Sequence, residues 1–359
     1  MNKIQRKKTR RIYIGKVPIG QGAPIAVQSM TKTDTRNIKA TVRQIKQLEQ
    51  AGCEIVRLAV PDMNAAKILG EIKKRIKIPI VADIHFNYRL AVEAIRQGVD
   101  GLRINPGNIG DNWKVKEVVS AAKDKKIPIR IGVNSGSLPK DLIDKYGHPS
   151  AEAMVEAAER HIEILEKQDF HDIKVSLKAS DVLKTVEAYR LFSSKYDYPL
   201  HVGITETGPV PEGVVKSSIG IGLLLLEGIG DTIRVSLTDS PITEVRVAYE
   251  ILRVTGLRQA GIEIISCPTC GRCEIDIKRM VKRVKKALKD IKEPLKIAVM
   301  GCSVNGPGEA KEADFGIAGG KKQGIVFVKG KIVKTVKEEE LIETLLNYIN
   351  SYKSSFTNF

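Results

Sequence analysis

Three cysteines in the C-terminal third of the chain have the spacing of a metal or cluster site. Cys267 and Cys270 are separated by two residues in a turn that contains Pro268, and Cys302 follows in a second, glycine-flanked loop. Two such loops can present three thiolates to one centre, which suits either zinc or an iron–sulfur cluster. With five cysteines in 359 residues, this clustering is typical of metal binding in a reducing compartment and not of secreted disulfides.

Spacing alone leaves the fourth ligand of such a site open. Cys273 extends the pattern to Cys-x2-Cys-x2-Cys, Glu309 lies in the loop after Cys302, and solvent is the third candidate. A structural zinc site is the alternative interpretation. Cys53 stands apart, directly before a predicted strand, and is expected to be a buried free thiol.

A second pattern is a set of polar residues at the ends of short β-branched runs. Five of eight such runs end in or near a cation. The candidate residues are Arg57, Arg103, Arg130, Lys178 and Arg234, with His85, Asn134 and Ser236 near them. Cations gathered in one place repel each other unless an anion neutralises them, so we expect a phosphate or diphosphate ligand. Structural ion pairs with neighbouring carboxylates are the alternative.

Two further residues of these segments are candidates for acid–base roles. Glu206, in the segment GITETG, could serve as a general acid among the cations. An isolated glutamate is more often an ion-pair partner. His85, in DIHF, could donate to a phosphate or pair with Asp83.

These residues must be positioned by the repeating units that contain them. Short strands alternate with amphipathic helical stretches from Ile25 to about Thr255. The predicted strands are 25–28, 54–58, 78–82, 101–104, 129–132, 173–176, 200–203 and 232–235. The predicted helices are 36–51, 62–75, 88–97, 111–125, 150–167, 180–195, 211–227 and 241–254. Eight βα units predict a TIM-type (β/α)8 barrel, whose strand ends meet at one mouth. An open doubly wound sheet is the alternative.

The pattern changes after Gly261, which predicts a second, smaller α+β domain. Its predicted elements are a basic helix over 276–290, a strand over 296–300, a hairpin over 325–333 and a final helix over 338–352. We therefore divide the chain into a substrate-binding barrel, 1–258, and a cluster-carrying domain, 259–359.

Composition limits the partners and the compartment. The net charge of +17 suits nucleic acid, an acidic protein or an anionic substrate. The longest apolar stretch, Ile219–Ile229, is too short to span a bilayer, and no apolar segment follows the basic first residues. We expect a cytoplasmic protein.

Seven segments together resemble the 4-hydroxy-3-methylbut-2-en-1-yl diphosphate synthases of the non-mevalonate isoprenoid route. They are VQSMTKTDT (27–35), VADIHFN (81–87), LRINPGNIG (102–110), RIGVNSGSL (130–138), GITETG (203–208), SCPTCGR (266–272) and GCSVNGPGEA (301–310). The resemblance covers nearly the whole chain. It implies an oxidoreductase that opens the ring of 2-C-methyl-D-erythritol 2,4-cyclodiphosphate with two electrons and loss of water.

The resemblance also implies roles for individual residues. A [4Fe–4S] cluster would be held by Cys267, Cys270, Cys302 and Glu309, so that Cys273 departs from the family pattern. The substrate would be bound by Arg57, His85, Arg103, Arg130, Asn134, Lys178, Arg234 and Ser236, and Glu206 and Glu309 would be catalytic. The implied partners are reduced flavodoxin or ferredoxin, both acidic, and a second copy of the chain in a head-to-tail homodimer.

Three rival interpretations remain at the level of the sequence. A zinc-ribbon protein that binds nucleic acid would use the positive charge, but one Trp and 5% aromatic content leave few residues for base stacking. A radical enzyme that uses S-adenosylmethionine lacks its Cys-x3-Cys-x2-Cys spacing. A phosphate-binding barrel with other chemistry, such as a pterin synthase, is the third.

Overall fold

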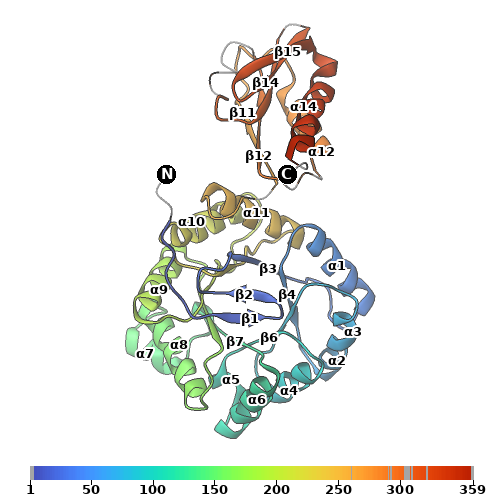
Figure 1. Cartoon of the computed structure of the whole chain (residues 1–359). Helices are drawn as coiled ribbons and strands as arrows, with labels where there is room; N and C mark the ends of the chain where they lie inside the picture. Colours follow the sequence, from blue (N-terminus) through green and yellow to red (C-terminus); the bar gives the residue numbers. More distant parts are fainter. Residues whose placement is uncertain are drawn as a thin grey trace. The chain divides into compact units, whose positions relative to one another are not determined.

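The computed structural model divides the chain into two compact units, Met1–Arg258 and Gln259–Phe359 (Figure 1). The structure describes residues 4–259, 261–289, 291, 293–302, 308, 310–320 and 322–356. The expected fold class is confirmed: the first unit is a closed parallel barrel of the TIM type, and the second is a smaller α+β unit.

Eight parallel strands form the barrel in the part of the first unit that the structure describes. They are β3 (Ala26–Met30), β4 (Ile55–Ala59), β5 (Ile80–Asp83), β6 (Gly101–Ile104), β7 (Ile129–Asn134), β8 (Ile173–Lys178), β9 (His201–Val202) and β10 (Thr232–Ile233). The strand order is β8-β7-β6-β5-β4-β3-β10-β9, and a parallel bridge between Val175 and Leu200 joins β8 to β9. This bridge closes the sheet, so the doubly wound alternative is wrong.

The helices lie around the strands (Figure 1). They are α1 (Ile38–Gln50), α2 (Met63–Lys67), α3 (Leu69–Lys73), α4 (Tyr88–Arg96), α5 (Pro106–Ile109), α6 (Asn112–Lys125), α7 (Lys140–Tyr146), α8 (Ala151–Glu166), α9 (Val182–Lys195), α10 (Glu212–Leu226) and α11 (Pro241–Val254), with a 3-10 turn η1 (Ser135–Ser137). The predicted helix 62–75 is two short helices, and α5 and α7 were not predicted, because four to seven residues are too few to show a helical period.

An N-terminal hairpin that the sequence pattern did not predict closes one end of the barrel. It consists of β1 (Ile12–Ile14) and β2 (Val17–Ile19). Its buried isoleucines form one apolar cluster with the inward-facing side chains that begin β3, β4 and β5, namely Ala26, Ile55 and Val81. Because burying this cluster removes apolar surface from water, the hairpin stabilises the barrel and seals the end opposite the strand C-termini.

The alternation of side chains along a strand places the polar residues inside the barrel. Successive side chains point to opposite faces. Ala26, Ile55 and Val81 face inward, so the residues two positions later on the same strands, Gln28, Arg57 and Asp83, face inward too, nearer the C-terminal mouth. Val27, Val56 and Leu58 instead join the apolar core under the helices.

The second unit is built on a five-stranded mixed sheet within its described residues. The strands are β11 (Ile262–Ser266), β12 (Leu295–Met300), β13 (Phe315–Gly319), β14 (Gln323–Val328) and β15 (Lys331–Lys337), in that order. The helices are α12 (Ile277–Ala287), the 3-10 turn η2 (Glu338–Glu340) and α14 (Leu341–Phe356). Strands β11 and β13 were not predicted. The glycines of β13 obscured its strand pattern, yet Gly316 lies against the Phe327 ring of β14, where a Cβ would have no room.

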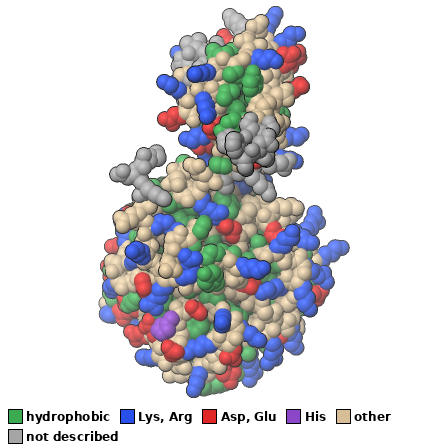
Figure 2. All heavy atoms as spheres, in the orientation of Figure 1, with side chains coloured by type: hydrophobic (Ala, Val, Ile, Leu, Met, Phe, Trp, Pro, Cys, Tyr) green, Lys and Arg blue, Asp and Glu red, His purple; other side chains and the backbone are tan. Residues whose placement is uncertain are grey.

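No helix among the described residues is both long and apolar enough to cross a membrane. Figure 2 shows Lys and Arg side chains spread over the visible face of both units. The positive charge by itself therefore does not locate a functional site.

Candidate active site

Asp83 is the centre of the charge network inside the barrel mouth. Its carboxylate lies 3.3 Å from Arg103 NH1 and 3.6 Å from Arg57 Nε. Burial would raise the pKa of Asp83, but the charges of Arg57, Arg103 and Arg130 hold it below its usual value. The strand register brings these side chains together, since Asp83 is opposite Arg103, and Arg103 is opposite Arg130, on adjacent strands.

The cations of the mouth have more donors than the protein satisfies. Arg130 is 4% exposed and donates from NH1 to Ser176 Oγ at 2.5 Å, while its Nε and NH2 are buried without a partner. The Nε atoms of Arg103 and Arg234 are also buried and unpaired. Unpaired buried donors are costly. Several of them converging on one barrel mouth are the arrangement expected of an anion site.

Two glycines make room for these cations. A Cβ on Gly132 would lie 2.6 Å from Arg103 Nε, and a Cβ on Gly203 would lie 2.7 Å from Lys178 Nζ. A side chain at Gly132 would press on Arg103, and one at Gly203 would also meet the backbone carbonyl of Arg234. Glycine is therefore required in RIGVN and in GITETG by packing contacts that only the tertiary structure creates.

Burial and mutual repulsion lower the pKa values of these cations. The pKa of Lys178 falls well below its ordinary value because the side chain is buried, and Arg130 and Arg234 lower it further. The pKa of Arg234 falls to about 10, mainly through burial. Burial also lowers the pKa of His85, with Asp83 opposing the shift. An anion in the mouth would oppose all of these shifts.

The expected ion-pair alternative accounts for only part of the network. Asp83 pairs with Arg57 and Arg103 as that alternative predicts. Asp231, however, pairs with Arg6, and Glu54 pairs with Arg258, outside the predicted set. Glu206 forms no ion pair within the described part of the chain. The carboxylates at hand are therefore fewer than the cations.

Glu206 differs from the buried residues of the mouth. It is exposed and has a φ of 53°, in the left-handed region that residues with a side chain rarely adopt. Such backbone strain is concentrated at functional sites. Of the other predicted residues, His85 is exposed with its ring 3.3 Å from Arg103 NH1, whereas Asn134 and Ser236 are half-buried. Asn134 pairs in register with Lys178.

Sequence reasoning missed Glu244 in this mouth, whereas Gln28 was among the polar residues expected at the strand ends. Glu244, on α11, is 2% exposed, lies 3.1 Å from Lys32 Nζ and 4.0 Å from Arg234 NH2, and accepts from Leu237 N–H. Gln28 is equally buried, with both amide atoms unpaired. Glu244 gave no signal because it lies in an ordinary amphipathic helix.

The cysteines of the second unit gather around Gly301. The Gly301 N–H donates to Cys267 Sγ at 3.2 Å, and a Cβ on Gly301 would lie 2.5 Å from Cys273 Sγ. Cys302 is the next residue along the chain. Cys270 is exposed, and hydrogen bonds with Arg272 lower the pKa of its thiol. Across the described residues no three candidate ligands are assembled for a metal ion, and Glu309 lies outside those residues.

Cys53 is a buried free thiol, as expected. Burial raises its pKa to about 12. It plays no part in either site.

The fold defines the class: a TIM-type barrel with buried, unpaired cationic donors inside it, followed by a separate α+β unit that carries cysteines. Family models identify the member: the GcpE TIM-barrel domain matches residues 9–249, and the GcpE protein C-terminal domain matches residues 263–351. The chain belongs to the GcpE family, and the resemblance seen in its sequence motifs is confirmed.

Named relatives agree with this assignment. A protein of Thermodesulfovibrio yellowstonii named 4-hydroxy-3-methylbut-2-en-1-yl diphosphate synthase (flavodoxin) is 82% identical over 346 residues, which cover 96% of this chain and 99% of that protein. A protein of Lawsonia intracellularis with the same name is 60% identical over 346 residues, which cover 96% of each chain. The expectation of an oxidoreductase is confirmed, and the nucleic-acid alternative finds no support.

A comparison with solved structures supports the fold alone. The N-acetylneuraminic acid synthetase of Leptospira borgpetersenii matches with a TM-score of 0.50 and 13% identity, covering 80% of this chain and 100% of that one.

Proposed function

We propose that this chain is a 4-hydroxy-3-methylbut-2-en-1-yl diphosphate synthase, which reductively opens 2-C-methyl-D-erythritol 2,4-cyclodiphosphate. Two electrons and two protons enter, one C–O bond to the ring phosphate is broken, and one hydroxyl leaves as water. The observation that carries the substrate is the excess of buried, unpaired cationic donors in the barrel mouth. Membership of the GcpE family supports the proposed reaction.

The diphosphate is held by Arg57, Arg103, Arg130 and Lys178 in this proposal. Charge-assisted hydrogen bonds from planar guanidinium groups suit phosphate oxygens. The unpaired Nε and NH2 of Arg130 and the unpaired Nε of Arg103 supply donors that no protein group uses. Arg234, His85, Asn134 and Ser236 line the rest of the pocket. A bound diphosphate would relieve the repulsion among the cations.

Glu206 is the proton donor to a leaving oxygen. Its carboxyl is exposed on the loop after β9, two residues before Gly208, and forms no ion pair within the described part of the chain. The strained φ of 53° holds the residue in a conformation that the backbone would otherwise avoid. A positioned general acid of this kind contributes about 10²- to 10⁴-fold to a rate.

The thiols of Cys267, Cys270 and Cys302, with Glu309 as the fourth ligand, would hold a [4Fe–4S] cluster. Soft thiolates suit iron–sulfur chemistry. The Gly301 N–H that donates to Cys267 Sγ is the kind of hydrogen bond that tunes a ligating sulfur. The bound cluster would supply single electrons and an iron that can accept a substrate oxygen.

Cys273 is not a ligand in this proposal. Its Sγ donates to the Ile275 carbonyl at 3.1 Å, so its proton is used within the protein, whereas Cys267 Sγ accepts. Cys273→Ser should therefore keep iron content and turnover. Cys267→Ser is the matched change and should lose the cluster. Loss of iron in the Cys273 variant would show that the ligand set is wrong.

The decisive experiment combines metal analysis with turnover. Anaerobically purified chain should contain about four iron and four sulfide and absorb near ~400 nm. It should convert the cyclodiphosphate when a small reductant such as reduced methyl viologen supplies electrons. One zinc, no sulfide and no turnover would contradict the proposal and favour the structural-zinc alternative.

We also propose that the enzyme is a cytoplasmic head-to-tail homodimer in which one subunit's cluster serves its partner's barrel. Support comes from the family resemblance. A mixture of Glu206→Gln chains and Cys302→Ser chains tests it, because each mixed dimer keeps one intact pair of barrel and cluster. Turnover should return on mixing after subunit exchange. Continued inactivity of mixed dimers, shown by mass to have formed, would contradict the composite site.

A further inference from the structure

Helix α12 carries a broad cationic face. Its exposed cations, together with those of the two residues that follow it, are Lys278, Arg279, Lys282, Arg283, Lys285, Lys286 and Lys289. At about 100° per residue they cover a continuous arc of roughly 160°. The opposite side, with Ile277, Met280 and Val284, is buried against the sheet. From Ile277 to Lys289 the sequence has no acidic residue.

None of these seven cations forms an ion pair within the described residues. Helix α8 neutralises some cations locally, since Glu156 pairs with both Lys145 and Arg160. A face of unpaired like charges costs stability through self-repulsion. The repulsion is relieved when an acidic surface covers the helix.

The cationic face begins beside the cysteine site. Helix α12 follows Cys273 after three residues, and its N-cap Asp276 accepts from the Arg279 N–H. The connecting segment is joined to the cysteine loop, because Glu274 N–H donates to the Gly301 carbonyl while Gly301 N–H donates to Cys267 Sγ. A protein bound on α12 is therefore held next to the thiols.

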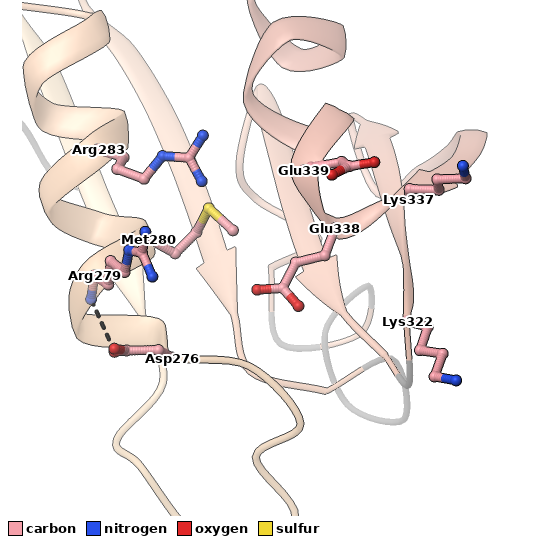
Figure 3. Close-up of a pocket in the computed structure, with 8 residues that line it drawn as sticks. All are labelled: Asp276, Arg279, Met280, Arg283, Lys322, Lys337, Glu338 and Glu339. Carbon is pink, nitrogen blue, oxygen red and sulfur yellow. Dashed lines mark hydrogen bonds between the residues drawn. The ribbon is translucent and has the colours of Figure 1, made fainter.

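The pocket next to α12 does not explain this charge. Figure 3 shows Arg279 and Arg283 on the helix facing the segment that carries Glu338 and Glu339. The pocket is lined by Asp276, Arg279, Met280, Arg283, Lys322, Lys337, Glu338 and Glu339. Four cations meet three carboxylates there, so the pocket is nearly neutral. The unbalanced charge lies on the outer arc, at Lys278, Lys282, Lys285 and Lys289.

We propose that this outer arc of α12 is the docking surface for the acidic flavodoxin that reduces the cluster. The inference rests on the proposed function, because it needs a cysteine site that accepts electrons from a protein. The names of the relatives include flavodoxin as the donor. One electron passes from the reduced flavin of the donor to the cluster in each encounter. Complementary charge speeds such encounters without tight binding.

A matched pair of variants tests the docking surface in the full-length, cluster-loaded enzyme. Lys278→Glu, Lys282→Glu and Lys285→Glu together reverse the arc. The control reverses Lys39, Arg43 and Lys46 to Glu on α1, which are exposed, have the same i, i+4, i+7 spacing and form no ion pair in the described structure. Both triple variants change the net charge equally. They differ only in which surface is altered.

Three measurements separate docking from catalysis. The arc variant should raise the KM for reduced flavodoxin by about tenfold or more and weaken flavodoxin binding measured by fluorescence anisotropy. Its turnover with reduced methyl viologen should stay at the wild-type level. The α1 control should match wild type in all three measurements. An unchanged KM and unchanged anisotropy in the arc variant would overturn the proposal.

Other outcomes are equally decisive. Wild-type enzyme inactive with methyl viologen would refute the proposed function, whereas the anisotropy assay would still report on docking. Loss of nucleic-acid binding in the arc variant with flavodoxin binding intact would overturn the docking proposal in favour of a nucleic-acid surface. If the Glu triple fails to fold, the Gln triple at the same positions should raise the KM to a smaller extent, and no rise would overturn the proposal.

Discussion

The barrel mouth and the outer arc of α12 are both rich in cations, but the protein treats the two regions differently. In the mouth, Arg103 and Arg130 are buried, contact Asp83 and Ser176, and keep buried donors without a partner. On α12 the Lys side chains are exposed and unpaired in the described structure. Buried cations act at short range in a low dielectric, whereas exposed cations act through a field that salt screens.

The difference teaches that the positive charge of one protein can serve two purposes, ligand recognition and attraction of a partner protein. A rigid set of desolvated donors recognises one small anion with defined geometry. A flexible, solvated set attracts an acidic surface and releases it again. If this comparison is right, the two regions should respond oppositely to mutation, pH and salt.

Arg130→Leu should have the largest effect. It should lower kcat/KM for the cyclodiphosphate by about 10³-fold, since losing one partner of a buried charged contact costs about 2–5 kcal/mol. The unliganded protein should not lose stability, because Arg130 is repelled by Arg57 and Arg103. Kinetics and urea unfolding check both parts. Stability lost in step with activity would mean that Arg130 serves the fold and not the ligand.

Glu206→Gln should lower kcat by about 10²-fold with either reductant, through loss of the general acid. Its stability should equal that of wild type, because the side chain is exposed. Glu206→Gly is the companion change: it should be as inactive but more stable by about 1 kcal/mol, since glycine adopts a positive φ without strain. Full activity in the Gln variant would remove Glu206 from the mechanism.

Asp83→Asn should cost about 3 kcal/mol of stability, because it leaves buried cations without their carboxylate. The pKa of Asp83 is lower in the folded chain than in the unfolded chain. Its stabilising contribution is therefore complete above about pH 4 and is lost as pH falls through the folded pKa. Urea unfolding between about pH 3 and 6 should show a flatter acid dependence in the variant. If the stability of the variant and of wild type fell equally with decreasing pH, the stabilising role of Asp83 would be contradicted.

Salt should produce the smallest and most selective effect. Raising the ionic strength from about 0.05 M to 0.3 M should raise the KM for flavodoxin several-fold, because an exposed surface is screened. The KM for the cyclodiphosphate should change less, since its cations are buried. Steady-state kinetics, with the flavodoxin concentration and then the cyclodiphosphate concentration varied, measure this contrast. Equal salt dependence would erase the distinction between the two regions.

Sequence alone predicted the barrel strands well but not every element that completes the fold. The β-branched runs around Arg57, Arg103 and Arg130 identified their strands, because a parallel strand is covered on both faces and is therefore rich in Val, Ile and Leu. The β1–β2 hairpin was missed, since three-residue strands give no period. Strand β13 was missed because Gly316 and Gly319 lower strand propensity, although packing against Phe327 and Ile275 requires them.

The chemistry of this protein was determined by residue type and spacing, which identified the cysteines, the strand-end cations and the family. Which cations lack a partner was decided only by the tertiary structure. Register brings Asp83 to Arg103, and Gly132 and Gly203 leave space for Arg103 and Lys178. The helix α11 contributes Glu244 from more than two hundred residues beyond Gln28. Charge balance inside a barrel depends on which strands and helices meet, and that contact is not written in any local pattern.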